Sequence, residues 1–173
     1  MSMKFVVGSL LVTIFQVLCH AQAASDDISP TQLQTILSLP LNQAVKQREV
    51  YKVPLKSAYD RQNALRDKDC QAQSDVGQQP YNLCMGEAAE QADKDLAIFY
   101  RNLQMLCHGQ DELTTLQTLH KTWLLYKESA MKAAHAAWPD GTGAPGFAAQ
   151  VYLSSVRDHM RELREIYGLN ISQ

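Results

Sequence analysis

The chain has 173 residues and a formal net charge of −2 at pH 7, with basic and acidic side chains interspersed along it. A chain of this length suits a single domain with its own core. The charge pattern provides no basic patch for nucleic acid, and the aromatic residues do not alternate with Lys and Arg as in a surface that binds single strands.

The first 23 residues are typical of a secretory signal peptide. Lys4 precedes an apolar run, Phe5–Leu18, and residues 21–23 form a small-x-small cleavage pattern. The run is shorter than the roughly 20 residues that a membrane-spanning helix needs, which favours cleavage over a retained anchor. We therefore expect a periplasmic or secreted mature chain that begins at Ala24 and has no integral membrane span.

A helical arm is predicted for residues 24–69. Thr31–Leu39 places apolar residues close to helical spacing, and a second helix begins near Asn42. Pro54 has no backbone N–H and biases the residue before it away from helical geometry, so we expect a break there. In this prediction the helix resumes over Leu55–Asp69.

A loop and then a long helix follow the arm. Gln71–Pro80 contains Gly77 among polar residues, which is typical of a loop. From Tyr81 the apolar residues recur at steps of three and four, which predicts a helix with one core-facing side that ends at Gly109. The core-facing positions are Cys84, Ala88, Ala92, Leu96, Phe99, Leu103 and Leu106.

Two further long helices complete the predicted fold. Asp111 can cap the first, which stops at Pro139, and an exposed turn over residues 139–146 leads to the second, Phe147–Tyr167, with Gly168 as its stop. The core-facing residues of the first are Leu116, Leu119, Trp123, Tyr126, Ala130, Ala133 and Ala137. Those of the second are Ala149, Leu153, Val156, Met160, Leu163 and Tyr167.

The sequence thus predicts an all-α protein, because no stretch combines β-branched enrichment with period-two alternation. Long helices joined by short turns pack antiparallel, so we expect a bundle of three long helices with shorter N-terminal helices packed across it. The expected organisation is a signal peptide over residues 1–23, an arm over 24–69, a bundle over 70–168 and a tail over 169–173.

Cysteine spacing favours one disulfide. Removal of Cys19 with the signal peptide leaves Cys70, Cys84 and Cys107, an odd number in an oxidising compartment. Cys84 and Cys107 lie on the same predicted helix, roughly 34 Å apart at 1.5 Å per residue, so they cannot pair. A Cys70–Cys84 bridge is favoured over three free thiols and would be worth roughly 3 kcal/mol, which leaves Cys107 unpaired.

No pattern in the sequence indicates catalysis or a cofactor. The pair Cys107-His108 lacks an identifiable base and orienting group, and the chain has no HExxH, CxxCH or GxSxG motif. His120, His135 and His159 are isolated, and His120 is expected to be a structural histidine beside Trp123. We therefore predict no enzyme, no catalytic residue, no metal site and no cofactor.

Two motifs carry a resemblance to a known family. The first has a cysteine, a polar loop and a second cysteine that begins a helix with the pattern A-D-x-x-L-N-x-x-Y; it is matched by Cys70, Cys84, Ala92, Asp93, Leu96 and Tyr100. The second is L-x-x-A-Q-x-x-W followed by an aromatic-Arg-acid step; it is matched more loosely by Leu116, Trp123 and Tyr126-Lys127-Glu128. From Cys70 to Leu163 the chain therefore resembles the LprI-like lysozyme inhibitor family of small exported bacterial proteins.

The chain also departs from the family pattern. Ala97 stands where Asn is usual, and His120 and Lys127 replace Gln and Arg. Many members place another cysteine after the second motif and its partner after a Gly-rich turn, whereas this chain has Ala130 and Met131 there and no cysteine beyond the turn. The second disulfide of the family is thus missing.

The resemblance implies an exported protein that binds and inhibits a lysozyme-type cell-wall hydrolase through protein contact. The two polar turns are the expected contact region, with Asp75, Gln78, Tyr81, Asp140 and Thr142 as candidate partner-binding residues. The motif residues Asp93, Tyr100 and Trp123 are expected to join the first two long helices. The alternative is an envelope adaptor, or an immunity protein that binds a toxin delivered between bacteria. Residues 24–69 lie outside the resemblance and favour this alternative.

Overall fold

The computed structural model describes residues 27–64, 68–138 and 141–172, and within these ranges the regular elements are helices with no strand. This confirms the predicted all-α bundle. The helices are α2 (Pro30–Leu37), α3 (Leu41–Ala64), α4 (Lys68–Ser74), α5 (Gln78–Gln104), α6 (Gln110–Ala137), α7 (Ala144–Ile166) and α8 (Gly168–Ser172).

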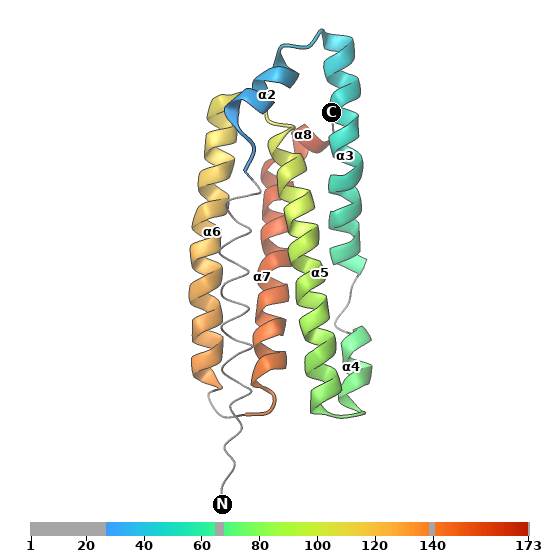
Figure 1. Ribbon diagram of the computed structural model, residues 1–173, viewed down its shortest axis with the longest axis vertical. Helices are drawn as coiled ribbons and strands as arrows, with labels where there is room; N and C mark the ends of the chain where they lie inside the picture. The colour runs from blue at the N-terminus through green and yellow to red at the C-terminus, as the bar shows by residue number, and fades with distance from the viewer. Residues whose placement is uncertain (1–26, 65–67, 139–140, 173) are drawn as a thin grey trace, which may run out of the picture.

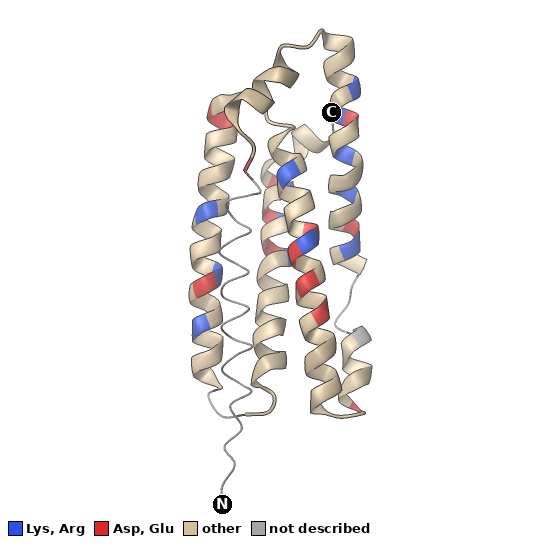
Figure 2. Ribbon diagram, in the orientation of Figure 1, with Lys and Arg blue, Asp and Glu red and all other residues tan. Residues whose placement is uncertain are grey.

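The long helices α3, α5, α6 and α7 run along the long axis of the molecule, and consecutive ones point in opposite directions (Figure 1). Helix α2 lies at one end of the bundle, and the short α4 lies beside the start of α5 (Figure 1). Helix α5 packs against both α3 and α7, and α6 packs against α7. Basic and acidic residues are mixed along α3, α5 and α6 on the face that Figure 2 shows.

Helix α3 differs from the predicted arm, because it is a single helix of 24 residues that continues through Pro54. The break expected at Pro54 is therefore wrong. A proline inside a helix costs about 3 kcal/mol through one lost backbone hydrogen bond and a clash with the preceding turn. Packing on α5 offsets this cost, since Leu55 and Ala58 of α3 are fully buried in the core directly after the proline.

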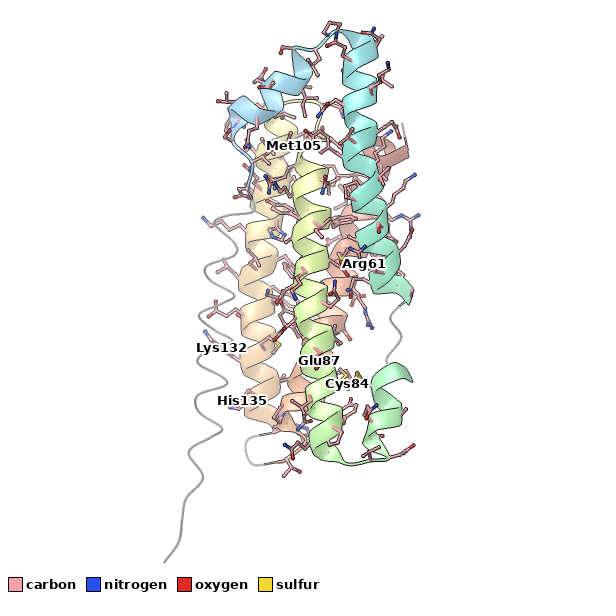
Figure 3. The ribbon with its side chains drawn as sticks, turned by 45° about the vertical axis from the view of Figure 1, so that its right-hand side comes forward. Arg61, Cys84, Glu87, Met105, Lys132 and His135 are labelled. Atoms are coloured by element: carbon pink, nitrogen blue, oxygen red, sulfur yellow. A yellow bond between two sulfur atoms is a disulfide. The ribbon has the colours of Figure 1, made fainter. Side chains whose placement is uncertain are left out.

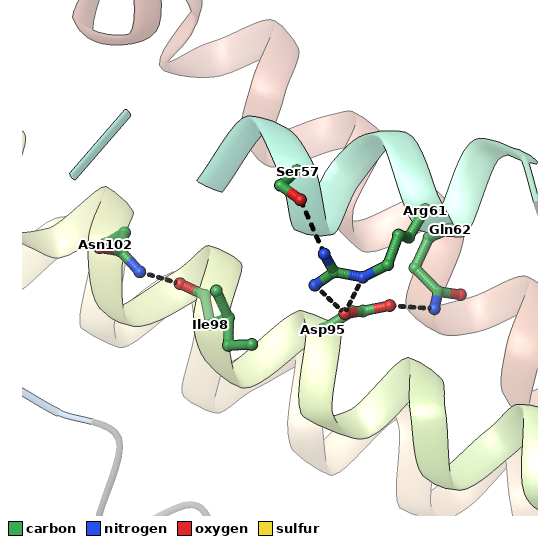
Figure 4. A network of polar contacts seen from close by, with 6 residues as sticks. All are labelled: Ser57, Arg61, Gln62, Asp95, Ile98 and Asn102. Atoms are coloured by element: carbon green, nitrogen blue, oxygen red, sulfur yellow. Dashed lines mark hydrogen bonds and ion pairs between the residues drawn. The ribbon is translucent and has the colours of Figure 1, made fainter. Parts of the chain in front are cut away.

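A buried carboxylate fixes α3 to α5 (Figure 4). Asp95 of α5 is completely buried, and its Oδ1 accepts a hydrogen bond from Arg61 Nε at 2.9 Å. Its Oδ2 accepts from Gln62 Nε2 at 2.7 Å, while Arg61 also donates to Ser57 Oγ. The hydrogen bond with Asp95 raises the pKa of Arg61. Removing this carboxylate would leave two donors of α3 without their acceptor at the core.

The helix ends near the α5–α6 connection also differ from the prediction. Helix α5 ends at Gln104 instead of Gly109, because Leu106 and Cys107 turn into the core and are fully buried. Gly109 is the N-cap of α6, so Asp111 lies in the first turn of that helix and is not its cap. At the C-terminal end, Gly168 begins α8 and does not stop the chain's helical structure.

The predicted core faces hold for α5 and α7, whereas α6 is rotated relative to its prediction. Three predicted core positions of α6 are exposed: Tyr126, Ala133 and Ala137. Tyr126 is 64% exposed, and Lys127 beside it is only 7% exposed. Lys127 Nζ donates to Tyr152 OH at 3.2 Å and lies 5.0 Å from the centroid of the Trp123 ring, so its charge has partners in the core.

Candidate functional site

A disulfide between Cys70 and Cys84 joins α4 to the second turn of α5 (Figure 3). Their Cα atoms are 5.5 Å apart, and Cys107 is the free cysteine among the described residues. The predicted pairing is therefore confirmed. The bridge ties together the two helices that flank the turn at residues 75–77.

The loop predicted for residues 71–80 is wrong for most of its length. Residues 71–74 belong to α4 and residues 78–80 belong to α5, so only residues 75–77 lie between the helices. Pro80 is compatible with helix here, because the first N–H groups of a helix have no acceptor within it. Gly77 has a φ of 152°, a conformation that residues with a side chain rarely adopt.

Hydrogen bonds connect the start of α5, directly after the turn at residues 75–77, to the turn between α6 and α7. Gln78 Nε2 donates to Asn82 Oδ1 at 2.9 Å, and Asn82 Nδ2 donates to the Thr142 carbonyl at 2.8 Å. Two of the candidate partner-binding residues, Gln78 and Thr142, are thus brought together although they lie far apart in sequence. Asp140 lies outside the described residues.

Close packing at Gly146 holds the same turn. Gly146 is buried in the first turn of α7, although the sequence placed it in an exposed turn. A Cβ atom at this position would lie 2.5 Å from Asn82 Oδ1 and 2.7 Å from Tyr81 Cε1, so only glycine fits without a shift. Tyr81, another candidate partner-binding residue, is half-buried and contributes to this packing.

We call residues 75–78, Trp138 and residues 141–143 the turn end of the bundle. Asp75 and Thr142 are exposed on it, Val76 is 73% exposed and Trp138 is 51% exposed. The Trp138 ring stacks on Phe147, with ring centroids 5.6 Å apart. The turn end therefore presents polar and apolar side chains on a backbone that is restrained by the bond from Asn82 to Thr142 and by the packing at Gly146.

The motif residues lie where α5, α6 and α7 meet. Asp93 of α5 accepts a hydrogen bond from the Tyr152 hydroxyl of α7. Tyr100 of α5 stacks on His120 of α6, with centroids 3.7 Å apart, and its hydroxyl donates to Asp27 Oδ1 at 2.6 Å. The motif residues Ala92, Leu96, Leu116 and Trp123 are buried.

Two histidines that the sequence treated as isolated form a buried pair. His120 Nδ1 lies 3.0 Å from His159 Nε2, and the Trp123 ring lies parallel to His159 at 4.2 Å. His120 also lies against Trp123, as predicted, with centroids 5.6 Å apart. Burial lowers the pKa of His120 to about 4 and that of His159 to about 3, with the charge of Lys127 adding to both shifts. Both rings are therefore neutral at pH 7.

A family model described as "Lysozyme inhibitor LprI" matches residues 70–163, which is more than half of the chain. The chain belongs to this family. The resemblance found in the sequence, with the same bounds, is thus confirmed. Comparison with curated proteins and with solved structures finds no match.

The LprI match includes the turn end, and the structure shows how this member holds its Gly-rich turn without a second disulfide. Ala130 and Met131 occupy the positions where the resemblance places a cysteine in many members. In this chain the bond from Asn82 to Thr142 and the close packing at Gly146 restrain the turn instead. Helices α2 and α3 lie outside the match.

A concave surface lies between α6 and α7, within the LprI match. It is a groove of about 470 Å³, and the exposed Tyr126 is on its wall. Trp123 of α6 and Ser155, Asp158, His159 and Glu162 of α7 also line it. Sequence reasoning missed this groove, because it assigned Tyr126 to the core.

The geometry around Cys107 does not favour nucleophilic chemistry. The thiol is fully buried, and burial together with the charge of Glu112 raises its pKa to about 12. It is therefore a thiol and not a thiolate at neutral pH. The neighbouring His108 contacts Glu112 and Arg48 at the surface.

Within the described ranges, no set of three or more His, Cys, Asp or Glu side chains is arranged to hold a metal ion. None of the helices described has the combined length and apolar character that crossing a membrane requires.

Proposed function

We propose that the chain is an exported inhibitor that binds a lysozyme-type cell-wall hydrolase through its turn end. The observation that carries the proposal is the bond from Asn82 to Thr142, which joins the two turns into one surface. The Cys70–Cys84 disulfide ties together the two helices that flank the first of these turns. Membership of the LprI lysozyme inhibitor family supports the inhibitory role. The disulfide is consistent with export to an oxidising compartment.

The turn end has the composition of a binding surface. Val76 and Trp138 offer apolar contact area, and tryptophan is among the side chains that most often dominate the energy of an interface. Asp75, Gln78 and Thr142 supply polar groups around them. Because the backbone is fastened before binding, association avoids most of the entropy cost of ordering a loop.

Inhibition assays test the proposal directly. The mature chain is added in molar excess to a panel of purified lysozymes, and the rate of cell-wall lysis is followed. We expect lysis to slow with at least one of them. Trp138→Ala should weaken inhibition roughly 30-fold, since loss of an interface hot spot costs about 2 kcal/mol.

The matched control is Val53→Ala, which removes an exposed apolar side chain from α3, outside the family match. It should inhibit like the wild type. An unchanged lysis rate with every lysozyme in the panel would refute the inhibitory role. Equal inhibition by the wild type and Trp138→Ala would refute the turn end as the contact surface.

Exposed apolar side chains on α3 favour a second candidate, an envelope adaptor or an immunity protein against a toxin delivered between bacteria. The exposed residues are Leu41, Val45, Val50 and Val53. The double variant Val45→Ser/Val53→Ser should then lose a stoichiometric partner that the wild type retains from envelope extract, while its helical content is unchanged. Recovery of no such partner by the wild type would count against this candidate.

A further inference from the structure

Two polar atoms on the α7 wall of the groove have no hydrogen-bond partner in the folded chain. They are Ser155 Oγ and His159 Nδ1, both of which are buried, and both residues line the groove. Glu162 lies three residues further along the same wall. Because these positions follow one another at steps of four and three, the side chains lie on one face of the helix. A buried polar atom without a partner destabilises the fold, so a ligand that supplies the partner is stabilised here.

The unpartnered histidine nitrogen and the Glu162 carboxylate are separated by a short gap. His159 Nδ1 lies 3.7 Å from Glu162 Oε2, which is too far for a direct hydrogen bond. The other ring nitrogen, Nε2, lies 3.0 Å from His120 Nδ1. A neighbouring carboxylate favours the tautomer that carries the proton on Nδ1. The gap therefore has an N–H donor on one side and a carboxylate acceptor on the other.

A group that joins these two atoms must accept one hydrogen bond and donate another. A hydroxyl does both, and at ordinary hydrogen-bond lengths of about 2.8 Å a single oxygen reaches both atoms. A guanidinium or ammonium group has donors only and an ionised carboxylate has acceptors only, so none of these can form the bridge. Nδ1 is covered in the folded chain, but the Glu162 side chain beside it is 54% exposed and has room to turn aside.

The opposite wall of the groove offers an aromatic surface. Tyr126 of α6 is 64% exposed there, and Trp123 lies deeper, with its ring parallel to His159 at 4.2 Å. The exposed face of Tyr126 suits an apolar ligand face. Among the described residues no Lys or Arg lines the groove, whereas Asp158 and Glu162 do, so an anion is disfavoured. The lining thus favours a neutral ligand with hydroxyls and one apolar face.

We propose that this groove binds a neutral sugar in its pyranose form. One hydroxyl bridges His159 Nδ1 and Glu162, a second meets Ser155 Oγ about one helical turn away, and the C–H face of the ring stacks on Tyr126. The groove volume of about 470 Å³ is within the range of small-molecule sites. This site is separate from the turn end and does not depend on inhibition of a lysozyme.

The test uses Trp123 as a reporter. The chain has two tryptophans, so Trp138→Phe leaves Trp123 as the single one and retains an aromatic ring beside Phe147. This variant is titrated separately with maltotriose, cellotriose and triacetylchitotriose while tryptophan fluorescence is recorded. We expect a saturable change with at least one of them, and the sugar that binds most tightly identifies the preferred ring. Sorbitol, which has hydroxyls but no ring face, should produce no saturable change.

Each wall of the groove has a matched pair of variants, made in the Trp138→Phe background. Tyr126→Ala removes the stacking surface and Glu162→Ala removes the hydroxyl acceptor, and each should weaken binding of the best trisaccharide about tenfold. Leu125→Ala and Glu165→Ala, at exposed positions that do not line the groove, should leave binding unchanged.

Three results would overturn the proposal. The first is the absence of a saturable change with all three trisaccharides, which would leave the gap beside His159 to a bridging water. The second is a saturable change with sorbitol equal to that with the trisaccharides. The third is wild-type binding by both Tyr126→Ala and Glu162→Ala.

Discussion

Replacement of Gly146 by alanine tests the packing that fixes the turn end. The new Cβ would lie 2.5 Å from Asn82 Oδ1 and 2.7 Å from Tyr81 Cε1. Since such atoms normally stay roughly 3.5 Å apart, both neighbours must move by up to about 1 Å. Overpacking of this kind costs about 1–3 kcal/mol, and a displaced Asn82 loses its bond to Thr142, worth about 1 kcal/mol. Alanine's better helix propensity returns at most about 1 kcal/mol. We therefore expect Gly146→Ala to destabilise the chain by about 2 kcal/mol.

The same substitution at Gly86 is the matched control. Gly86 lies inside α5, and a Cβ built there meets no atom within 4 Å. Gly86→Ala should therefore stabilise the chain by up to about 1 kcal/mol. Urea unfolding at pH 7 measures both variants, and the slope of free energy against urea should match that of the wild type. If Gly146→Ala and Gly86→Ala raised the unfolding midpoint alike, the close approach at Gly146 would not exist in solution.

Three further predictions concern groups inside the bundle. The double variant Cys70→Ser/Cys84→Ser should lose about 3 kcal/mol of unfolding free energy, and an unchanged urea midpoint would contradict the role of the disulfide. Because the folded pKa values of His120 and His159, about 4 and about 3, lie below the ordinary histidine value of about 6.5, the unfolded chain takes up protons first on acidification. The free energy of unfolding should therefore be independent of these two groups above about pH 6.5. At lower pH it should decrease by up to about 1.4 kcal/mol per pH unit for each histidine. Urea unfolding at successive pH values should show a smaller decrease for His120→Gln/His159→Gln than for the wild type. Cys107 should resist iodoacetamide in the native chain and react after unfolding in urea, whereas rapid native alkylation would contradict its burial.

Hydrophobic periodicity predicted α5 and α7 well, because both helices bury a continuous apolar side. Ala92, Leu96, Phe99 and Leu103 are buried at steps of three and four, as the pattern indicates. The disulfide was also predictable, since helix length excluded pairing between Cys84 and Cys107 and Cys70 lies only 14 residues before Cys84. Local pattern and tertiary structure agree in these places.

Sequence reasoning failed where a tertiary contact outweighs a local preference. Lys127 reads as a surface residue, yet Tyr152 and the Trp123 ring meet its charge in the core, and Tyr126 is turned outward as a result. Pro54 reads as a helix break, yet the packing of α3 on α5 carries the helix through it. The pairing of His120 with His159 joins two helices, so no local spacing indicates it.

The positions of the helix ends at the turn end determine how much backbone entropy an inhibitor of this shape would lose on binding. A flexible loop from residue 71 to residue 80 would lose about 1–2 kcal/mol of backbone entropy for each residue ordered on binding. Residues 71–74 and 78–80 are instead already helical, and only residues 75–77 connect them. Gly77 holds this short turn in a conformation that glycine adopts readily. In the proposed complex, the binding energy of Val76 and Trp138 would then be available for affinity, and a change that loosens the turn should weaken binding even when every contact residue is intact.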